Sequence, residues 1–211
     1  MTERSQSLGE EIANSVSHGV ALLAALVAAP FLITTTGHLG TTHLIGASVF
    51  AATLVTLYLT STLYHALPSG PTKQLFMKLD HCAIYLFIAG SYTPFALVAL
   101  DDTWSWLLFG LVWAFAFFGV ALKAFDRLSH PWISTGLYLV MGWLVLFAAI
   151  PLVERVPQLG ITFLVAGGVA YTVGVVFFVL DSRVRYAHAV WHGFVVTGSG
   201  FHLFAVLNYS A

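Results

Sequence analysis

Two histidines, His188 and His192, stand four positions apart at the start of an apolar run that extends from Gly193 to Leu207. On an α-helix this spacing places both imidazoles on one face, about one turn or roughly 5.4 Å apart. Two neutral imidazoles at that separation can bind one metal ion. Because polar residues within membrane segments usually mark function, this pair is the first candidate for a site.

The composition indicates an integral membrane protein. The 211 residues are 59% hydrophobic and 8% charged, whereas a soluble domain carries about 25% charged residues. Since a span needs about 20 residues, seven spans with short loops use up the chain, and we expect a single seven-helix domain over residues 1–211. The formal net charge of −1 argues against a nucleic-acid partner. The expected partners are membrane lipids.

The hydropathy pattern predicts an all-α bundle of seven transmembrane helices. The expected spans are Ala13 to Thr36, Thr42 to Leu67, Phe76 to Leu100, Thr103 to Phe125, Trp132 to Val153, Leu159 to Leu180 and Ala187 to Tyr209. Pro30 and Pro94 fall inside spans, where we expect them to kink or locally loosen the helix.

The positions of Lys and Arg predict the orientation, because these residues favour cytoplasmic loops. Seven of the eight Lys and Arg residues fall on one side of the predicted bundle, and only Arg155 falls on the other. We therefore expect a multi-pass protein of the plasma (inner) membrane with its N-terminus in the cytoplasm and its C-terminus outside. This orientation is the reverse of that of a G-protein-coupled receptor, which argues against that class.

This topology brings polar residues from four helices to a similar depth near the cytoplasmic side. They come from the end of the second helix and from the starts of the first, third and seventh helices. The residues are Glu11, Asn14, Ser15, His18, Ser61, His65, Asp80, His81, His188 and His192. Hydropathy alone does not require such a gathering.

A zinc ion would account for the gathering, because a catalytic zinc typically has three protein ligands and one open position. The candidate ligands are His65, His188 and His192. Asp80 is the candidate general base, and Ser61 lies one turn before His65 on the same face of its helix. The alternative is that these histidines are hydrogen-bonded packing residues.

His81, the residue after Asp80, is a second candidate ligand. His81 points about 100° away from Asp80 on the helix, so both cannot face one centre equally. We take Asp80 as the inward residue, with His81 as a ligand in the alternative. Cys82 is the only cysteine, which excludes a cysteine-rich zinc site and an intrachain disulfide.

Other polar residues have supporting or unrelated roles. His202 lies some 15 Å beyond His192 along the helix axis, and we expect it to make an internal hydrogen bond. Glu11 and His18 either support the site from behind the ligands or solvate the start of the first helix.

The motifs taken together resemble a known family. They are Glu11-x-x-Asn14-x-x-x-His18, Ser61-x-x-x-His65, Asp80 with the run Ile-Ala-Gly-Ser-Tyr-Thr-Pro that ends at Pro94, and His188-x-x-x-His192. In this order, and over nearly the whole chain, they resemble the hemolysin III family, the bacterial branch of the progestin and adipoQ receptor superfamily.

The resemblance implies a seven-helix fold with zinc held by His65, His188 and His192. It also implies that Asp80 contacts the metal through water, with Ser61 beside it. The similar adiponectin receptors are linked to ceramide hydrolysis, and alkaline ceramidases show a similar pattern more distantly. The chain lacks the long cytoplasmic N-terminal region of those receptors, which argues against a receptor role.

Two functions remain after these arguments. The first is a zinc-dependent hydrolase of an amide or ester in a membrane lipid, with Asp80 managing the proton. The second is a non-enzymatic regulator or sensor of membrane-lipid or membrane-energetics homeostasis, in which a structural zinc pins two helices together. A cytolysin is disfavoured because the chain has no soluble form. A transporter is disfavoured because the charged residues cluster near one face.

Overall fold

The computed structural model describes residues 4–98, 102–128 and 131–209. Helices account for nearly all of this part of the chain. They are α1 (Leu8–Gly37), α2 (Thr41–Ala66), α3 (Pro71–Val98), α4 (Asp102–Ala124), α5 (Pro131–Trp143), the 3₁₀ helix η1 (Leu144–Ala148), α6 (Ala149–Arg155), α7 (Gln158–Leu180) and α8 (Ala187–Tyr209). Within these described ranges, seven segments are long and apolar enough to cross a membrane, with α5, η1 and α6 together forming the fifth. The predicted seven-helix membrane bundle is confirmed.

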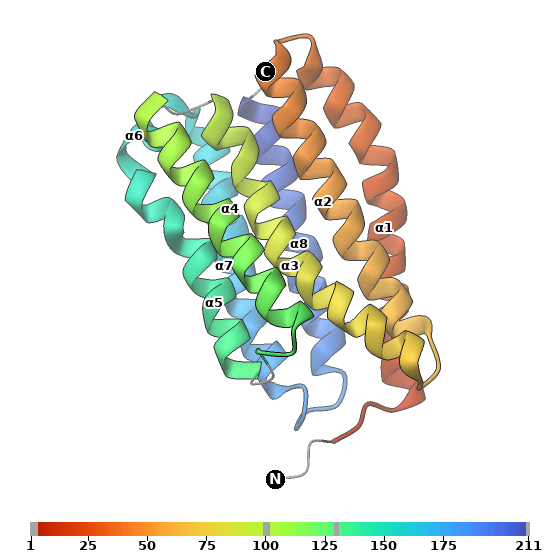
Figure 1. Cartoon of the computed structure of the whole chain (residues 1–211). Helices are drawn as coiled ribbons and strands as arrows, with labels where there is room; N and C mark the ends of the chain where they lie inside the picture. Colours follow the sequence, from red (N-terminus) through yellow and green to blue (C-terminus); the bar gives the residue numbers. More distant parts are fainter. Residues whose placement is uncertain (1–3, 99–101, 129–130, 210–211) are drawn as a thin grey trace.

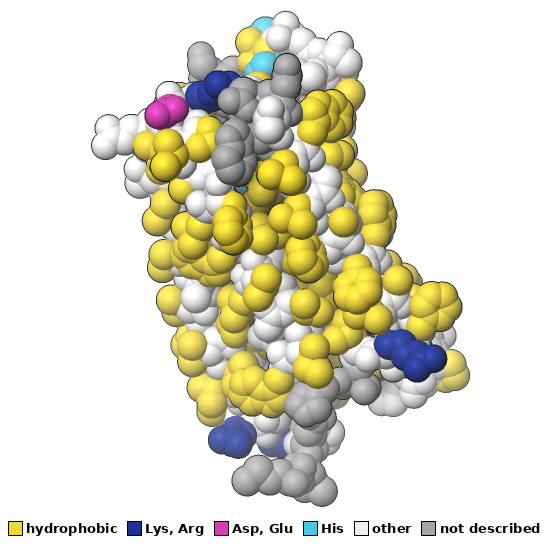
Figure 2. All heavy atoms as spheres, turned by 60° about the vertical axis from the view of Figure 1, so that its left-hand side comes forward, with side chains coloured by type: hydrophobic (Ala, Val, Ile, Leu, Met, Phe, Trp, Pro, Cys, Tyr) yellow, Lys and Arg dark blue, Asp and Glu magenta, His cyan; other side chains and the backbone are white. Residues whose placement is uncertain are grey.

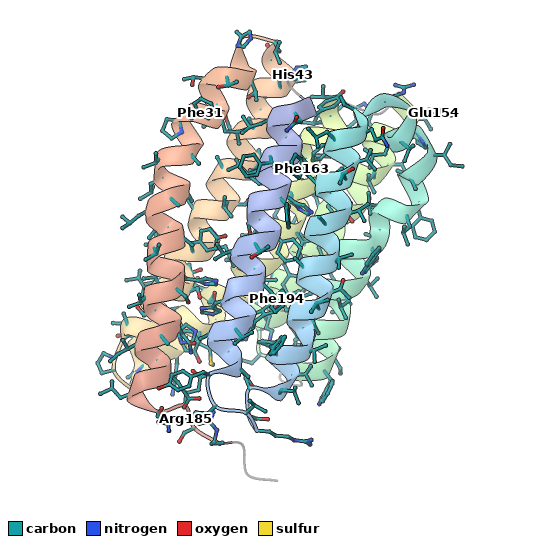
Figure 3. The ribbon with its side chains drawn as sticks, turned by 180° about the vertical axis from the view of Figure 1, so that it is seen from behind. Phe31, His43, Glu154, Phe163, Arg185 and Phe194 are labelled. Carbon is teal, nitrogen blue, oxygen red and sulfur yellow. The ribbon has the colours of Figure 1, made fainter. Side chains whose placement is uncertain are left out.

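The helices run up and down in one bundle, with the start of α1 and the end of α8 at opposite ends (Figure 1). Consecutive helices α1 to α4 pack side by side, and α7 packs against α8. The bundle closes where α8 lies between α1 and α7, as seen from behind in Figure 3. The end of α2 and the starts of α1, α3 and α8 therefore lie at one end of the molecule.

Two helices begin earlier than the hydropathy pattern predicts. Helix α1 starts at Leu8 rather than Ala13, because Ser7 and Glu10 form a capping box that satisfies backbone N–H groups of the first turn. Helix α3 starts at Pro71 rather than Phe76, and proline suits a first helical position because it has no N–H to leave unpaired. The predicted end of the third span, Leu100, lies outside the described residues.

The fifth span is broken, although the sequence predicts one continuous helix from Trp132 to Val153. Pro151 lacks the N–H that would bond to the carbonyl of Phe147, and its ring crowds that carbonyl, so the chain tightens into η1 just before it. The hydroxyl of Tyr92, from α3, makes hydrogen bonds to the backbone groups that the break leaves unpaired. It lies 2.9 Å and 2.7 Å from the carbonyl oxygens of Met141 and Gly142 and accepts from the Val145 N–H at 3.0 Å. Polar backbone groups inside the membrane are thereby satisfied.

The two prolines singled out from the sequence lie inside helices that continue through them. Pro30 is part of α1 and Pro94 is part of α3. Pro94 sits at a close approach of α3 to α2, because a Cβ placed on Gly46 would lie 2.8 Å from the Pro94 Cα. Glycine at this position of α2 allows the two backbones to meet.

Apolar side chains cover the middle of the molecule on the face shown in Figure 2, and charged side chains occur there only near the two ends. Many large apolar residues, including Val27, Phe147 and Ile150, are exposed, as expected for a surface that faces lipid. The core between the helices contains fully buried Leu32, Phe50 and Tyr85. It holds α2 and α3 firmly around the polar residues at their ends.

Candidate metal centre

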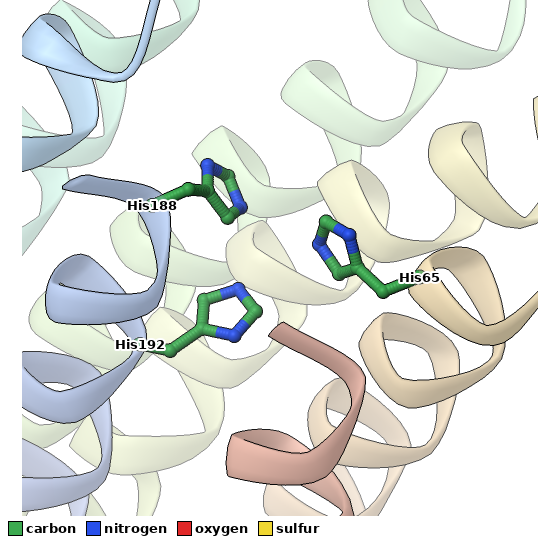
Figure 4. A group of neighbouring side chains, drawn as sticks. All are labelled: His65, His188 and His192. Carbon is green, nitrogen blue, oxygen red and sulfur yellow. The ribbon is translucent and has the colours of Figure 1, made fainter. Parts of the chain in front are cut away.

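Three histidines from two helices converge in the structure (Figure 4). They lie near the end of the bundle where α1 begins, because α2 ends and α8 starts there. His65 comes from the last turn of α2, and His188 and His192 come from the first two turns of α8. One ring nitrogen from each lies within 4.8 Å of those of the other two. The three ligands predicted from the sequence therefore come together in the structure.

Each of these rings is held by a hydrogen bond through Nδ1. His65 Nδ1 lies 2.8 Å from Glu11 Oε2, and His188 Nδ1 lies 2.9 Å from Asp181 Oδ2. His192 Nδ1 lies 3.2 Å from the carbonyl oxygen of Asn14. Because carboxylates and carbonyls only accept, each Nδ1 carries the proton and each Nε2 keeps its lone pair.

This arrangement suits a zinc ion. Metal-ligating histidines usually donate their second ring N–H to a carboxylate or a carbonyl, as all three rings do here. The buried Nε2 of His65 has no hydrogen-bond partner, and an unpaired polar atom inside a protein calls for a ligand or an ion. Three neutral imidazoles are a typical donor set for zinc. The residues present therefore fit the metal.

Asp80 and Ser61 lie beside the triad without joining it. Both are buried, at 9% and 1% exposure, and the Ser61 hydroxyl is a hydrogen-bonding neighbour of the Asp80 carboxyl. Asp80 does not belong to the group whose ligand atoms lie within 4.8 Å of one another. Its position suits a base that acts near the metal rather than a direct ligand.

A cavity of about 1320 Å³ opens next to these residues. Its polar end is lined by Asp80, His188 and His192, and its walls by apolar side chains such as Phe87 and Leu164. On α8 the lining continues from His188 to His202, a distance of roughly 21 Å at the helical rise per residue. The space is long enough to take a lipid chain alongside His188 and His192.

The polar stripe at the start of α1 supports the site, which answers the question that the sequence leaves open. Glu11 bonds to His65, and its second oxygen lies 3.1 Å from the Lys73 ammonium. The ring of His18 stacks on that of His192, with centroids 3.6 Å apart and planes 6° apart. Ser15, by contrast, donates to the Thr62 carbonyl and does not contact the triad.

His81 and His202 lie outside the triad. His81 Nδ1 lies 2.6 Å from the Met77 carbonyl one turn earlier, so His81 as a ligand in place of Asp80 receives no support. His202 is far along α8, where its ring packs edge-on against Tyr171. Cys82 lies 3.9 Å from the Val120 carbonyl, on the side of α3 that faces α4.

Three supporting residues were missed by the sequence reasoning. Asp181 and Ser17 contact His188 and His192, and Glu10 joins the starts of α1 and α8. The signal for Asp181 is a carboxylate at the end of α7, seven positions before His188. Ser17 and Glu10 give no such signal. Each lies next to a residue of the motif, and only the rotation of α1 within the bundle determines that its side chain faces α8.

Glu10 is buried at 2% exposure and accepts several hydrogen bonds. Arg4 donates to both carboxylate oxygens at 2.8 Å and 2.6 Å, and the backbone N–H of Tyr186 donates at 3.0 Å. The Glu10 carboxylate also raises the pKa of the Arg4 guanidinium. Tyr186 has a φ of 61°, a left-handed conformation that is strained for a non-glycine residue and persists only when its surroundings hold it. Glu10 thus holds the turn that leads into the two histidines of α8.

A family model described as Haemolysin-III related matches residues 6–203 of the chain. The chain belongs to the haemolysin III-related family. The resemblance stated from the sequence motifs is thereby confirmed, and the triad residues all lie within the part that matches this family.

Individual relatives cover almost the whole length of this family member. The chain is 39% identical over 210 residues to Hemolysin-3 of Bacillus cereus, covering 99% of this chain and 95% of that protein. It is 38% identical over 204 residues to the Hemolysin-3 homolog of Bacillus subtilis (strain 168), covering 96% and 95%. It is 27% identical over 209 residues to the human Monocyte to macrophage differentiation factor, covering 95% and 84%. No solved structure matches the chain.

Proposed function

We propose that this protein is a zinc-dependent hydrolase of an amide or ester bond in a membrane lipid, acting in the plasma membrane. The observation that carries the proposal is the composition of the site. Three histidines meet beside a buried carboxylate, at the polar end of an apolar cavity. Structural zinc sites usually have four protein ligands, whereas catalytic sites have three and leave one position for the reaction.

The residues divide the work as follows. His65, His188 and His192 would hold zinc through their Nε2 atoms. When bound there, zinc supplies an activated water molecule and polarises the carbonyl of the substrate. Asp80 takes up the proton that the water loses and passes it to the leaving group. The cavity holds the hydrocarbon part of the lipid and keeps bulk water away from the reacting bond.

A comparison of two variants tests the proposal. His192→Ala removes a ligand, so we expect it to lose zinc and, with the metal, thermal stability. Asp80→Ala should keep most of its zinc, with affinity lowered by about 10–100-fold, and lose turnover by at least about 10²-fold. His81→Gln is the matched control, because it changes the neighbouring residue of the same helix and leaves the triad intact.

Metal analysis, X-ray absorption, melting temperature and turnover of ceramide-like amides and esters are measured on the same preparations. We expect about one zinc per chain with nitrogen and oxygen ligands, because the single thiol lies off the triad. If Asp80→Ala loses zinc as completely as His192→Ala does, Asp80 is a ligand and its role as a base is wrong.

A regulator with a structural zinc is the second candidate, and one feature favours it. Helices α2 and α8 make few direct contacts with each other, since α1 packs against both. A zinc held by His65 from α2 and by His188 and His192 from α8 would join them. Absence of turnover on any lipid amide or ester, together with loss of a cellular phenotype in Asp80→Ala, would favour this candidate over the hydrolase.

A further inference from the structure

A fourth histidine, His18, lies next to the triad and is not one of its members. It is buried at 3% exposure, and its ring lies flat against that of His192. Its Nδ1 lies 2.8 Å from the hydroxyl oxygen of Ser61. Its Nε2 is buried and has no hydrogen-bond partner.

The direction of the His18–Ser61 hydrogen bond follows from the other ring nitrogen of His18. A proton on Nε2 would be a buried donor without an acceptor, whereas a proton on Nδ1 is donated to the Ser61 oxygen 2.8 Å away. Ser61 therefore accepts from His18 and keeps its own hydroxyl proton for the neighbouring Asp80 carboxyl. The reverse direction would leave a buried N–H on His18 without an acceptor and remove a donor from the carboxylate. That arrangement costs more than an unpaired lone pair on Nε2.

We propose that His18 is a positioning residue, which acts on Asp80 through Ser61. By donating to Ser61 from one side, it keeps the hydroxyl proton directed at the Asp80 carboxylate on the other. The carboxyl group is then held in one orientation in the cavity that His188 and His192 also line. The inference rests on the proposed hydrolase, because positioning matters for function only where Asp80 handles a proton. Flat stacking on His192 fixes the ring of His18 in the plane that this chain of hydrogen bonds needs.

Variants of His18 separate positioning from packing. His18→Asn places an amide N–H near the position of Nδ1 and can still donate to Ser61. His18→Phe keeps a flat ring against His192 and cannot donate. We expect His18→Phe to lower kcat by about tenfold or more, the size of one lost buried hydrogen bond, with little change in KM. We expect His18→Asn to stay within about threefold of the wild type. Both variants should retain wild-type zinc content.

The double variant His18→Phe with Ser61→Ala tests whether His18 acts through Ser61 in the hydrogen-bonded series from His18 to Asp80. If His18 acts only through Ser61, the double variant loses no more activity than Ser61→Ala alone. Equal losses in His18→Asn and His18→Phe would overturn the proposal in favour of a packing role. Loss of zinc in both would overturn it in favour of His18 as a metal ligand.

The protonation site of His18 tests the same hydrogen-bonded series directly, and measuring it requires no enzymatic activity. Nitrogen-15 NMR of histidine-labelled protein distinguishes a proton on Nδ1 from one on Nε2, and the His18 signals are assigned by their disappearance in His18→Asn. We expect the proton on Nδ1, with a shift of that resonance in Ser61→Ala. A proton on Nε2 would overturn the inference, because Ser61 would then donate to His18 instead of Asp80. Lack of turnover by the wild type would refute the proposed hydrolase. The position of the His18 proton tests the role of His18 separately.

Discussion

Single residues behind the triad decide how its rings are oriented. His65 and His188 each bond to a carboxylate, from Glu11 and Asp181, while His192 bonds to the backbone carbonyl of Asn14. These bonds keep the proton on Nδ1 and leave Nε2 available. Of the two carboxylates, Asp181 was not expected from the sequence, and its contribution can be tested by itself.

Replacing Asp181 by asparagine should weaken zinc binding. Asp181→Asn keeps the size of the side chain and removes the charge that holds His188, so we expect zinc affinity to fall by about 10–100-fold. Competition with a chelator of known affinity measures the change. The matched control is Asp126→Asn, since Asp126 lies at an exposed loop and pairs with Lys78. Equal affinities in the Asp181 and Asp126 variants would show that Asp181 does not support the metal.

Among the elements, the starts of α1 and α8 are joined through Glu10. In Glu10→Ala the N–H of Tyr186 and the guanidinium of Arg4 lose their acceptor. We expect the free energy of unfolding to fall by about 1 kcal/mol, the net contribution of hydrogen bonds whose donors are partly exposed and can turn to water. Thermal unfolding in detergent measures this loss. Glu154→Ala, an exposed carboxylate elsewhere on the bundle, is the control and should leave stability nearly unchanged.

The broken fifth span gives a second prediction for an element. Tyr92→Phe removes the hydroxyl that satisfies Met141, Gly142 and Val145, so we expect a loss of about 1–3 kcal/mol in stability. Reversible unfolding in mixed micelles measures it. Tyr138→Phe provides the comparison, because its hydroxyl donates to a carbonyl within helix α3, at His81. A larger loss in Tyr138→Phe than in Tyr92→Phe would contradict the role given to Tyr92.

For the whole molecule, the open prediction is its orientation in the membrane. The structure places the start of α1 and the end of α8 at opposite ends of the bundle, and the charge distribution predicts which end is cytoplasmic. A reporter fused to the C-terminus should report a location outside the cytoplasm. One inserted in the loop of Pro68 to Gly70 should report the cytoplasm. A cytoplasmic C-terminal reporter would refute the orientation and place the candidate metal centre near the outer side.

The sequence by itself determined the class of fold, the approximate spans and the candidate ligands. Hydropathy and helical spacing are local properties, so a run of apolar residues identifies a span and the i, i+4 pair His188 and His192 identifies a shared face. The prediction that His65 joins them needed one further step, the count of spans, which sets the end of the bundle at which each polar residue lies.

Only the tertiary structure decided which polar residues support the site and where a span breaks. His192 meets the carbonyl of Asn14, 178 positions away, and His18 meets Ser61, 43 positions away. Neither contact leaves a periodic trace in the sequence. Tyr92 similarly completes a break in a helix some fifty positions later. Such contacts depend on the rotation of one packed helix against another, which local spacing does not specify.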